Sequence, residues 1–164
     1  MLRELHVAAF ALAASGCLAA LWRVRRVPHE GIRLGLAGLV GASGVWATAE
    51  LVTFLPLPRP AVVVAYQVGL VAGLMTVGAW LYFCSAYAGH DYHLNPVYRR
   101  VAVAAFVCIS ALKLTNGLHG WYFELEVVTT PFRHANIDLL GLHWLATGVA
   151  YSLTAVGADR KSVV

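Results

Sequence analysis

The sequence contains little charge for its length. Of 164 residues, 12% are charged and 60% are apolar, and the mean hydropathy is +0.70. Soluble domains carry about 25% charged and about 45–50% apolar residues. A water-soluble fold of this size cannot bury so much apolar surface, so the composition excludes a soluble enzyme and a nucleic-acid-binding protein. It also excludes a disordered chain, because disordered chains are poor in aromatic and aliphatic residues.

Cysteine pairs and catalytic motifs are also missing. Cys17, Cys84 and Cys108 lie within apolar stretches and have no paired spacing, so the sequence predicts neither a disulfide framework nor a zinc site. Phosphate-binding loops, nucleophile elbows and kinase signatures do not occur in it. We therefore expect no catalytic residues, no bound metal and no resident cofactor.

Proline does not occur inside the long apolar stretches. All six prolines lie between five such stretches, where helix breakers belong. A helix needs about 20 mostly apolar residues to cross a bilayer. The sequence therefore predicts an all-α integral membrane protein, with residues 1–164 forming a single transmembrane domain. The predicted bundle has five transmembrane helices, at residues 5–22, 33–55, 61–89, 101–119 and 139–158, and an outer loop at 120–138.

Most of the 12 Lys and Arg residues fall on one side of this predicted bundle. The richer side carries Arg23, Arg25, Arg26, Arg33, Arg99, Arg100, Arg160 and Lys161. The side richer in Lys and Arg is normally cytoplasmic. We therefore expect the N-terminus outside, the C-terminus in the cytoplasm, and a multi-pass protein of a prokaryotic cell membrane. The first segment could also be interpreted as a signal peptide, but we expect a membrane span, because its basic residues follow the apolar run.

Two charged residues, Glu50 and Lys113, fall inside predicted spans. A charge at mid-bilayer costs about 2.5–3.5 kcal/mol on insertion scales, so such residues usually face the bundle interior and have a partner. Both are expected about 8–9 Å below the outer end of their helices. The sequence therefore predicts a Glu50–Lys113 ion pair. Two alternatives stay open, namely structural contacts between helices and snorkelling of Lys113 to the outer interface.

Other polar residues are expected at the same depth. Ser110, Lys113, Asn116 and His119 recur every three residues on the fourth predicted helix, and His143 lies near the outer end of the fifth. Polar groups from three helices would then meet beneath the outer loop. This convergence predicts a ligand- or signal-binding site that opens outward, formed by Glu50, Lys113, Asn116, His119 and His143.

Two other functions fit part of the pattern. His6, His119 and His143 all lie towards the outer edge, and two imidazoles at matched depth on facing helices could ligate haem b. The first alternative is therefore a haem- or quinone-binding anchor subunit of a redox complex. The second is a small transporter, which would need a site near mid-membrane and usually discontinuous helices.

An ordered set of aromatic and polar residues resembles a known family. It consists of Trp46 in Gly-Val-Trp-Ala, Tyr66, the stretch from Trp80 to Tyr87, and Thr115-Asn116-Gly-Leu-His119-Gly-Trp121. The chain resembles the N-terminal seven-helix sensor region found ahead of histidine kinases in archaea and bacteria. The likeness covers nearly the whole chain, and its most specific element is Thr-Asn-x-x-His. It adds Trp46, Tyr66, Trp80 and Trp121 to the candidate binding residues.

This resemblance implies a membrane input module that works in a two-component signalling system. A signal would shift the helix bundle, and a cytoplasmic kinase or signalling partner would read the shift. The chain departs from the family in having five predicted spans instead of seven and no kinase catalytic region, so we expect no enzymatic activity from it alone. Truncation, a stand-alone role and a homodimer all stay open.

Overall fold

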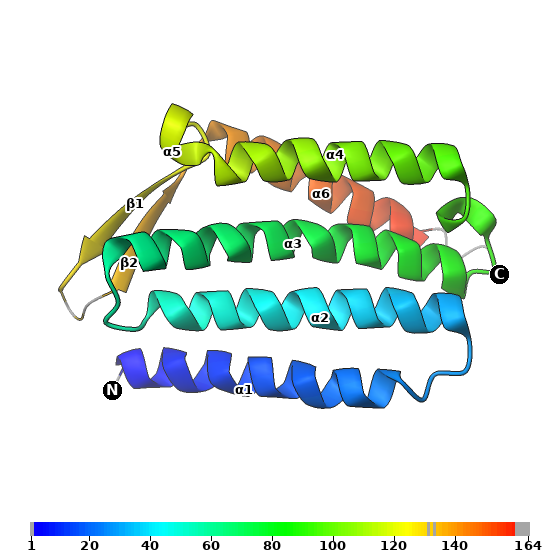
Figure 1. The fold of residues 1–164 in the computed structure, drawn as a ribbon, viewed down its shortest axis with the longest axis horizontal. Helices are drawn as coiled ribbons and strands as arrows, with labels where there is room; N and C mark the ends of the chain where they lie inside the picture. Colours follow the sequence, from blue (N-terminus) through cyan, green and yellow to red (C-terminus); the bar gives the residue numbers. More distant parts are fainter. Residues whose placement is uncertain (1, 131, 133, 160–164) are drawn as a thin grey trace.

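The computed structural model describes residues 2–130, 132 and 134–159. Its long helices lie side by side, and successive ones run in opposite directions (Figure 1). They are α1 (Leu2–Val24), α2 (Glu30–Thr53), α3 (Arg59–Tyr87), α4 (Pro96–Leu114) and α6 (Gly141–Asp159). Helix α2 lies between α1 and α3, whereas α4 and α6 both pack against α3. Helix α3 is therefore the element around which the others are arranged.

Among the described helices, α1, α2 and α3 are long and apolar enough to cross a membrane. Helices α4 and α6 are shorter, at 19 residues each. The structure thus agrees with a mainly helical membrane protein, while the number of spans and their orientation stay predictions.

Proline and asparagine lie at the starts of α3 and α4. Helix α3 has a proline in its first turn, and α4 begins at Pro96, where a missing N–H costs nothing. The side chain of Asn95 caps α4 by accepting a hydrogen bond of 2.9 Å from the Val97 N–H. Helix α4 ends at Leu114, not at residue 119 as predicted, and the short helix α5 (Asn116–His119) follows it. Asn116 and His119 therefore do not continue the polar stripe of α4.

The loop predicted at 120–138 contains a β-hairpin, so the chain is not all-helical. Strands β1 (Phe123–Val128) and β2 (His134–Leu139) form an antiparallel pair. Apolar and polar residues alternate in Phe-Glu-Leu-Glu, the period of a strand with one buried face. On the outward face Glu124 lies directly opposite Asp138.

The hairpin covers one end of the bundle and forms the main hydrophobic core with it (Figure 1). This core consists of Val62, Tyr66, Tyr122, Phe123 and Leu125. The Arg59 guanidinium at the start of α3 donates to the Leu125 carbonyl at 3.2 Å. The first turns of α3 and the hairpin are thus one packed unit.

The opposite end of α3 is fixed by the turn that leads into α4. This turn contains the short 3-10 helix η1 (Asp91–His93), which contacts α3. The His93 ring lies edge-on to Tyr82 with the centroids 4.7 Å apart, and its Nδ1 lies 3.0 Å from the Ser85 hydroxyl. Both ends of α3 are therefore held by non-helical segments.

Helices α2 and α3 are in close contact at Gly35. A Cβ atom placed there would lie 2.7 Å from the Phe83 Cα, a separation that real side chains do not adopt. The glycine is required here because the two backbones are in contact.

We predict that Gly35→Ala lowers the free energy of unfolding by about 1–3 kcal/mol, because the new methyl group forces α2 and α3 apart. Thermal unfolding in detergent, followed by circular dichroism, measures this. Gly78→Ala is the matched control, since a Cβ at Gly78 meets nothing within 4 Å. It should leave stability unchanged or raise it slightly. Equal melting temperatures for the two variants would contradict the close contact.

Candidate functional site

Lys113 lies in the last turn of α4 and is buried, with 5% of its surface exposed. Its Nζ donates a hydrogen bond of 2.7 Å to the main-chain carbonyl of Leu70 on α3. The same Nζ lies 5.4 Å from the centroid of the Tyr122 ring. The ammonium is therefore enclosed between α3, α4 and the start of the hairpin, and it does not snorkel to the interface.

The predicted Glu50–Lys113 ion pair is wrong. Within the described part of the chain, which includes both residues, no ion pair joins them. The Glu50 carboxylate interacts with Trp46 on its own helix and faces Gly69 on α3, where an added Cβ would lie 4.0 Å from its Oε1.

The reason is the position of α3 between the two charges. Gly69 and Leu70 are neighbours in sequence and point about 100° apart around the helix axis. Helix α2 packs on one of these sides and α4 on the other (Figure 1). Glu50 and Lys113 therefore contact different sides of α3, although each lies near the end of its helix at which the hairpin packs.

A second polar contact joins α3 to α4. The Gln67 amide nitrogen donates to the Leu114 carbonyl at 3.0 Å and, less closely, to the Lys113 carbonyl at 3.4 Å. It thereby satisfies carbonyl groups that the end of α4 leaves without intrahelical partners. We call the contacts of Gln67 and Lys113 with the facing main chain the α3–α4 clasp. Gln67 was not predicted from the sequence, because a single polar residue in an apolar segment has no periodic signal.

Asn116 connects the end of α4 to the hairpin. Its side chain is buried and donates to the Phe123 carbonyl at 2.7 Å, while its oxygen accepts from the Tyr122 N–H at 2.9 Å. Both polar atoms of the side chain are thus engaged by the main chain. Asn116 fixes where β1 begins relative to α4.

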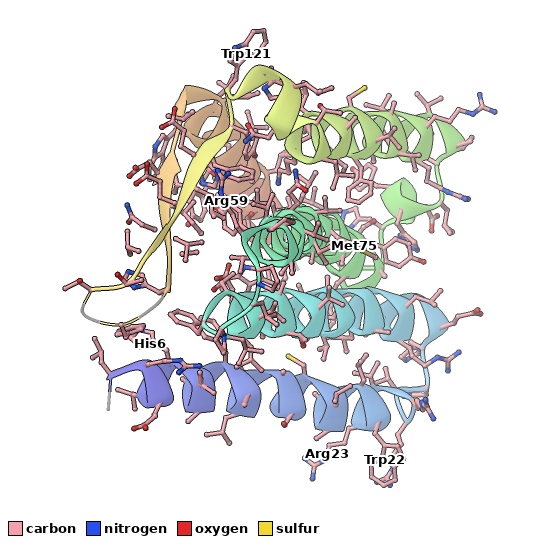
Figure 2. All side chains as sticks on the ribbon, turned by 60° about the vertical axis from the view of Figure 1, so that its left-hand side comes forward. His6, Trp22, Arg23, Arg59, Met75 and Trp121 are labelled. Atoms are coloured by element: carbon pink, nitrogen blue, oxygen red, sulfur yellow. The ribbon has the colours of Figure 1, made fainter. Side chains whose placement is uncertain are left out.

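His119 is also engaged by the main chain. Its Nδ1 accepts a hydrogen bond of 3.0 Å from the Trp121 N–H, so the proton is on Nε2, which lies 3.1 Å from the Leu112 carbonyl. Trp121 itself is 66% exposed and points away from the bundle (Figure 2). Both ring nitrogens of His119 are thus engaged by the main chain.

His143 lies on α6 beside Lys113 and Tyr122. Its ring centroid is 5.4 Å from that of Tyr122, and it interacts electrostatically with Lys113. Its Nδ1 is buried and has no hydrogen-bond partner among the described residues. Tyr122 is 1% exposed, and this burial raises its pKa to about 12, so the phenol is neutral at physiological pH.

Tyr66 links the two groups of charged residues. It is buried in α3, lies edge-on to Phe123 at 4.8 Å, and interacts electrostatically with both Glu50 and Tyr122. We define the polar layer as the titratable side chains beneath the hairpin, namely Glu50, Tyr66, Lys113, Tyr122 and His143. The sequence analysis had included all of them except Tyr122, which it placed in the outer loop.

Two tryptophans of the predicted site lie apart from the polar layer or at its edge. The Trp80 indole donates to the Thr154 carbonyl at 3.2 Å, and its position is about 21 Å farther along α3 than that of Tyr66. Trp46 is 45% exposed and lies edge-on to Phe10. The nine predicted residues therefore do not form one site.

A large apolar groove lies elsewhere, along α1, α2 and α3. Its volume is about 900 Å³, and its lining includes Gly38, Val45, Val68 and Met75. Thr48 also lines it, but the Thr48 hydroxyl donates to the Gly44 carbonyl of its own helix at 2.8 Å. The groove thus offers hydrocarbon contacts, and none of the polar-layer residues lines it.

Comparison with protein families gives a match over residues 5–158. The matching family is described as the N-terminal 7TM region of histidine kinase. Neither the curated proteins nor the solved structures gave a match. The family match confirms the resemblance carried by the sequence, and together with the apolar helices it indicates a membrane location.

We predict that Asn116→Ala lowers the free energy of unfolding by about 1–3 kcal/mol, because it leaves buried main-chain groups at residues 122 and 123 without partners. Thermal unfolding in detergent measures the loss. Asn136→Ala is the control, since Asn136 is exposed on β2 and its removal should change stability by no more than about 0.5 kcal/mol. If both variants unfold like the unchanged protein, Asn116 does not hold the hairpin.

Proposed function

Because the chain belongs to the N-terminal seven-transmembrane region of histidine kinases, we propose that it receives a signal in the membrane and passes it to a cytoplasmic kinase. The chain itself contributes no catalysis and needs no resident cofactor. It lies in a prokaryotic cell membrane as five spans, with the N-terminus and the hairpin outside. The arginines at the other end of α1, α2 and α4 support this orientation, since basic residues gather on the cytoplasmic side.

The observation that carries the proposal is the burial of the Lys113 ammonium with no carboxylate partner among the residues that the structure describes. A single carbonyl offsets only part of the free energy lost when a charge leaves water. Ionisable groups retained inside a membrane protein mark functional sites more often than structural ones. A rearrangement that gives Lys113 an anionic partner or water would therefore be favoured, and this makes the α3–α4 clasp sensitive to its surroundings.

The hydrogen bonds define a route from the outer face to α4. The hairpin is joined to the end of α4 by Asn116, and α4 is joined to α3 by the clasp. A ligand or force that displaces the hairpin would alter the clasp and shift α4 along α3. Such a signal acts only if it interacts differently with the two arrangements, so it shifts their populations.

The polar layer, which contains four of the predicted site residues together with Tyr122, is the region that responds to the signal in this proposal. Glu50 and Tyr66 are its responsive residues on the side of α3 that faces α2. Lys113 and His143 are its responsive residues on the side that faces α4 and α6. Asn116 and His119 position the hairpin above them. Trp121, which is exposed beside the hairpin, is the residue best placed to contact a signal from outside.

The test joins the chain to the dimerisation and catalytic regions of a histidine kinase and measures autophosphorylation. We predict that Lys113→Met changes the output about fivefold or more, the usual size of a coupling free energy. Its melting temperature should stay the same or rise, because a desolvated charge is removed. Lys113→Arg should retain intermediate output. Arg100→Gln, an exposed change on the same helix, is the control and should leave output unchanged.

A purely structural role for Lys113 gives a different result. In that case Lys113→Met would lower the melting temperature, and output would fall only in proportion to the folded fraction. Unchanged output in a stable Lys113→Met variant would equally reject the proposal.

A further inference from the structure

The outer face of α1 carries a notch near the end of the helix opposite the hairpin. It is lined by Gly16, Ala19, Ala20, Trp22 and Arg23 and has a volume of about 540 Å³. Trp22 is 60% exposed, and Figure 2 shows Trp22 and Arg23 both pointing away from the other helices. The notch therefore faces the surroundings of the bundle and not its interior.

The notch has an apolar part and a cationic part. Its floor is made of the small residues Gly16, Ala19 and Ala20, and at 1.5 Å per residue it extends about 10 Å inward from Arg23. Arg23 lies at its end, and Arg25 and Arg26 follow directly. The Arg26 guanidinium lies 4.5 Å from the centroid of the Trp22 ring, so the indole is held at the rim.

The order of these groups along α1, from small apolar residues to tryptophan and arginine, matches the layers of a bilayer. Tryptophan and arginine concentrate at the level of the lipid headgroups, whereas small apolar residues lie deeper, among the acyl chains. Clusters of basic residues at the end of a membrane helix attract anionic lipids. We infer that the notch binds an anionic phospholipid, with its headgroup at Arg23 and Arg26 and one acyl chain against Gly16, Ala19 and Ala20.

Charge favours a lipid over a second copy of α1. Two copies inserted in the same orientation and packed through this face would bring Arg23, Arg25 and Arg26 of each chain to the same depth. Like charges at close range oppose such packing. An anionic headgroup instead neutralises the arginines. The site is independent of the polar layer and of the proposed signalling function.

The test is a titration of the purified protein in detergent with phosphatidylglycerol or with phosphatidylcholine, read by native mass spectrometry. We expect the unchanged protein to retain phosphatidylglycerol in preference to phosphatidylcholine. Arg23→Gln should weaken this binding about fivefold, the factor that one basic residue contributes at an anionic surface, and should not affect phosphatidylcholine. Gly16→Leu should weaken binding of both lipids, because it fills the notch.

Matched variants make the result specific. A Cβ at Gly16 meets nothing within 4 Å, so a side chain has room to start there, and Gly78→Leu is the matched change on α3, where an added Cβ also meets nothing. Gly78→Leu and Arg100→Gln should bind lipid like the unchanged protein. If Arg100→Gln weakens phosphatidylglycerol binding as much as Arg23→Gln does, the attraction is general and the notch is not a site. Unchanged lipid binding by Gly16→Leu would also overturn the inference. So would a mass spectrum in which Gly16→Leu loses a protein dimer and not a bound lipid.

Discussion

The hydrogen bond from Lys113 to the Leu70 carbonyl determines how α4 sits on the rest of the molecule. Most of the α4 surface is exposed, and lipid gives such a helix no hydrophobic reason to associate with its neighbours. Polar contacts therefore decide its position, and Gln67 supplies another of them. In the proposed mechanism, a change in the electrostatics of this one ammonium group moves the helix. This is the physical basis for treating the polar layer as responsive.

The hydrophobic core lies under the hairpin, near the end of the bundle, and this placement follows from the solvent. Along the helices that are apolar enough to cross the membrane, hydrocarbon replaces water, so an apolar side chain such as Leu12 stays exposed at little cost. Where the chain leaves the lipid, apolar side chains must be buried again. Tyr66, Tyr122 and Phe123 are buried there by the hairpin, and Asn116 supplies the hydrogen bonds that fix its start.

Sequence patterns predicted the long helices, since proline and apolar length define them, and they singled out Lys113 and Asn116 as unusual. They could not predict which side of α3 each charge would face, because helix length gives depth but not rotation relative to a neighbour. The prediction of a Glu50–Lys113 ion pair was wrong for this reason. The hairpin was missed although Phe123–Val128 alternates like a strand. Gln67 gave no signal, because its role depends on a carbonyl that only the folded chain brings near.

The length of α3 has a mechanical consequence. Its 29 residues extend over about 43 Å, more than the roughly 30 Å of bilayer hydrocarbon. One end is packed into the hairpin core through Tyr66, and the other contacts η1 through Tyr82. Helices α2, α4 and α6 all pack against α3. A tilt of α3 imposed at either of its ends therefore alters three helix interfaces together, without any unfolding between the two membrane surfaces.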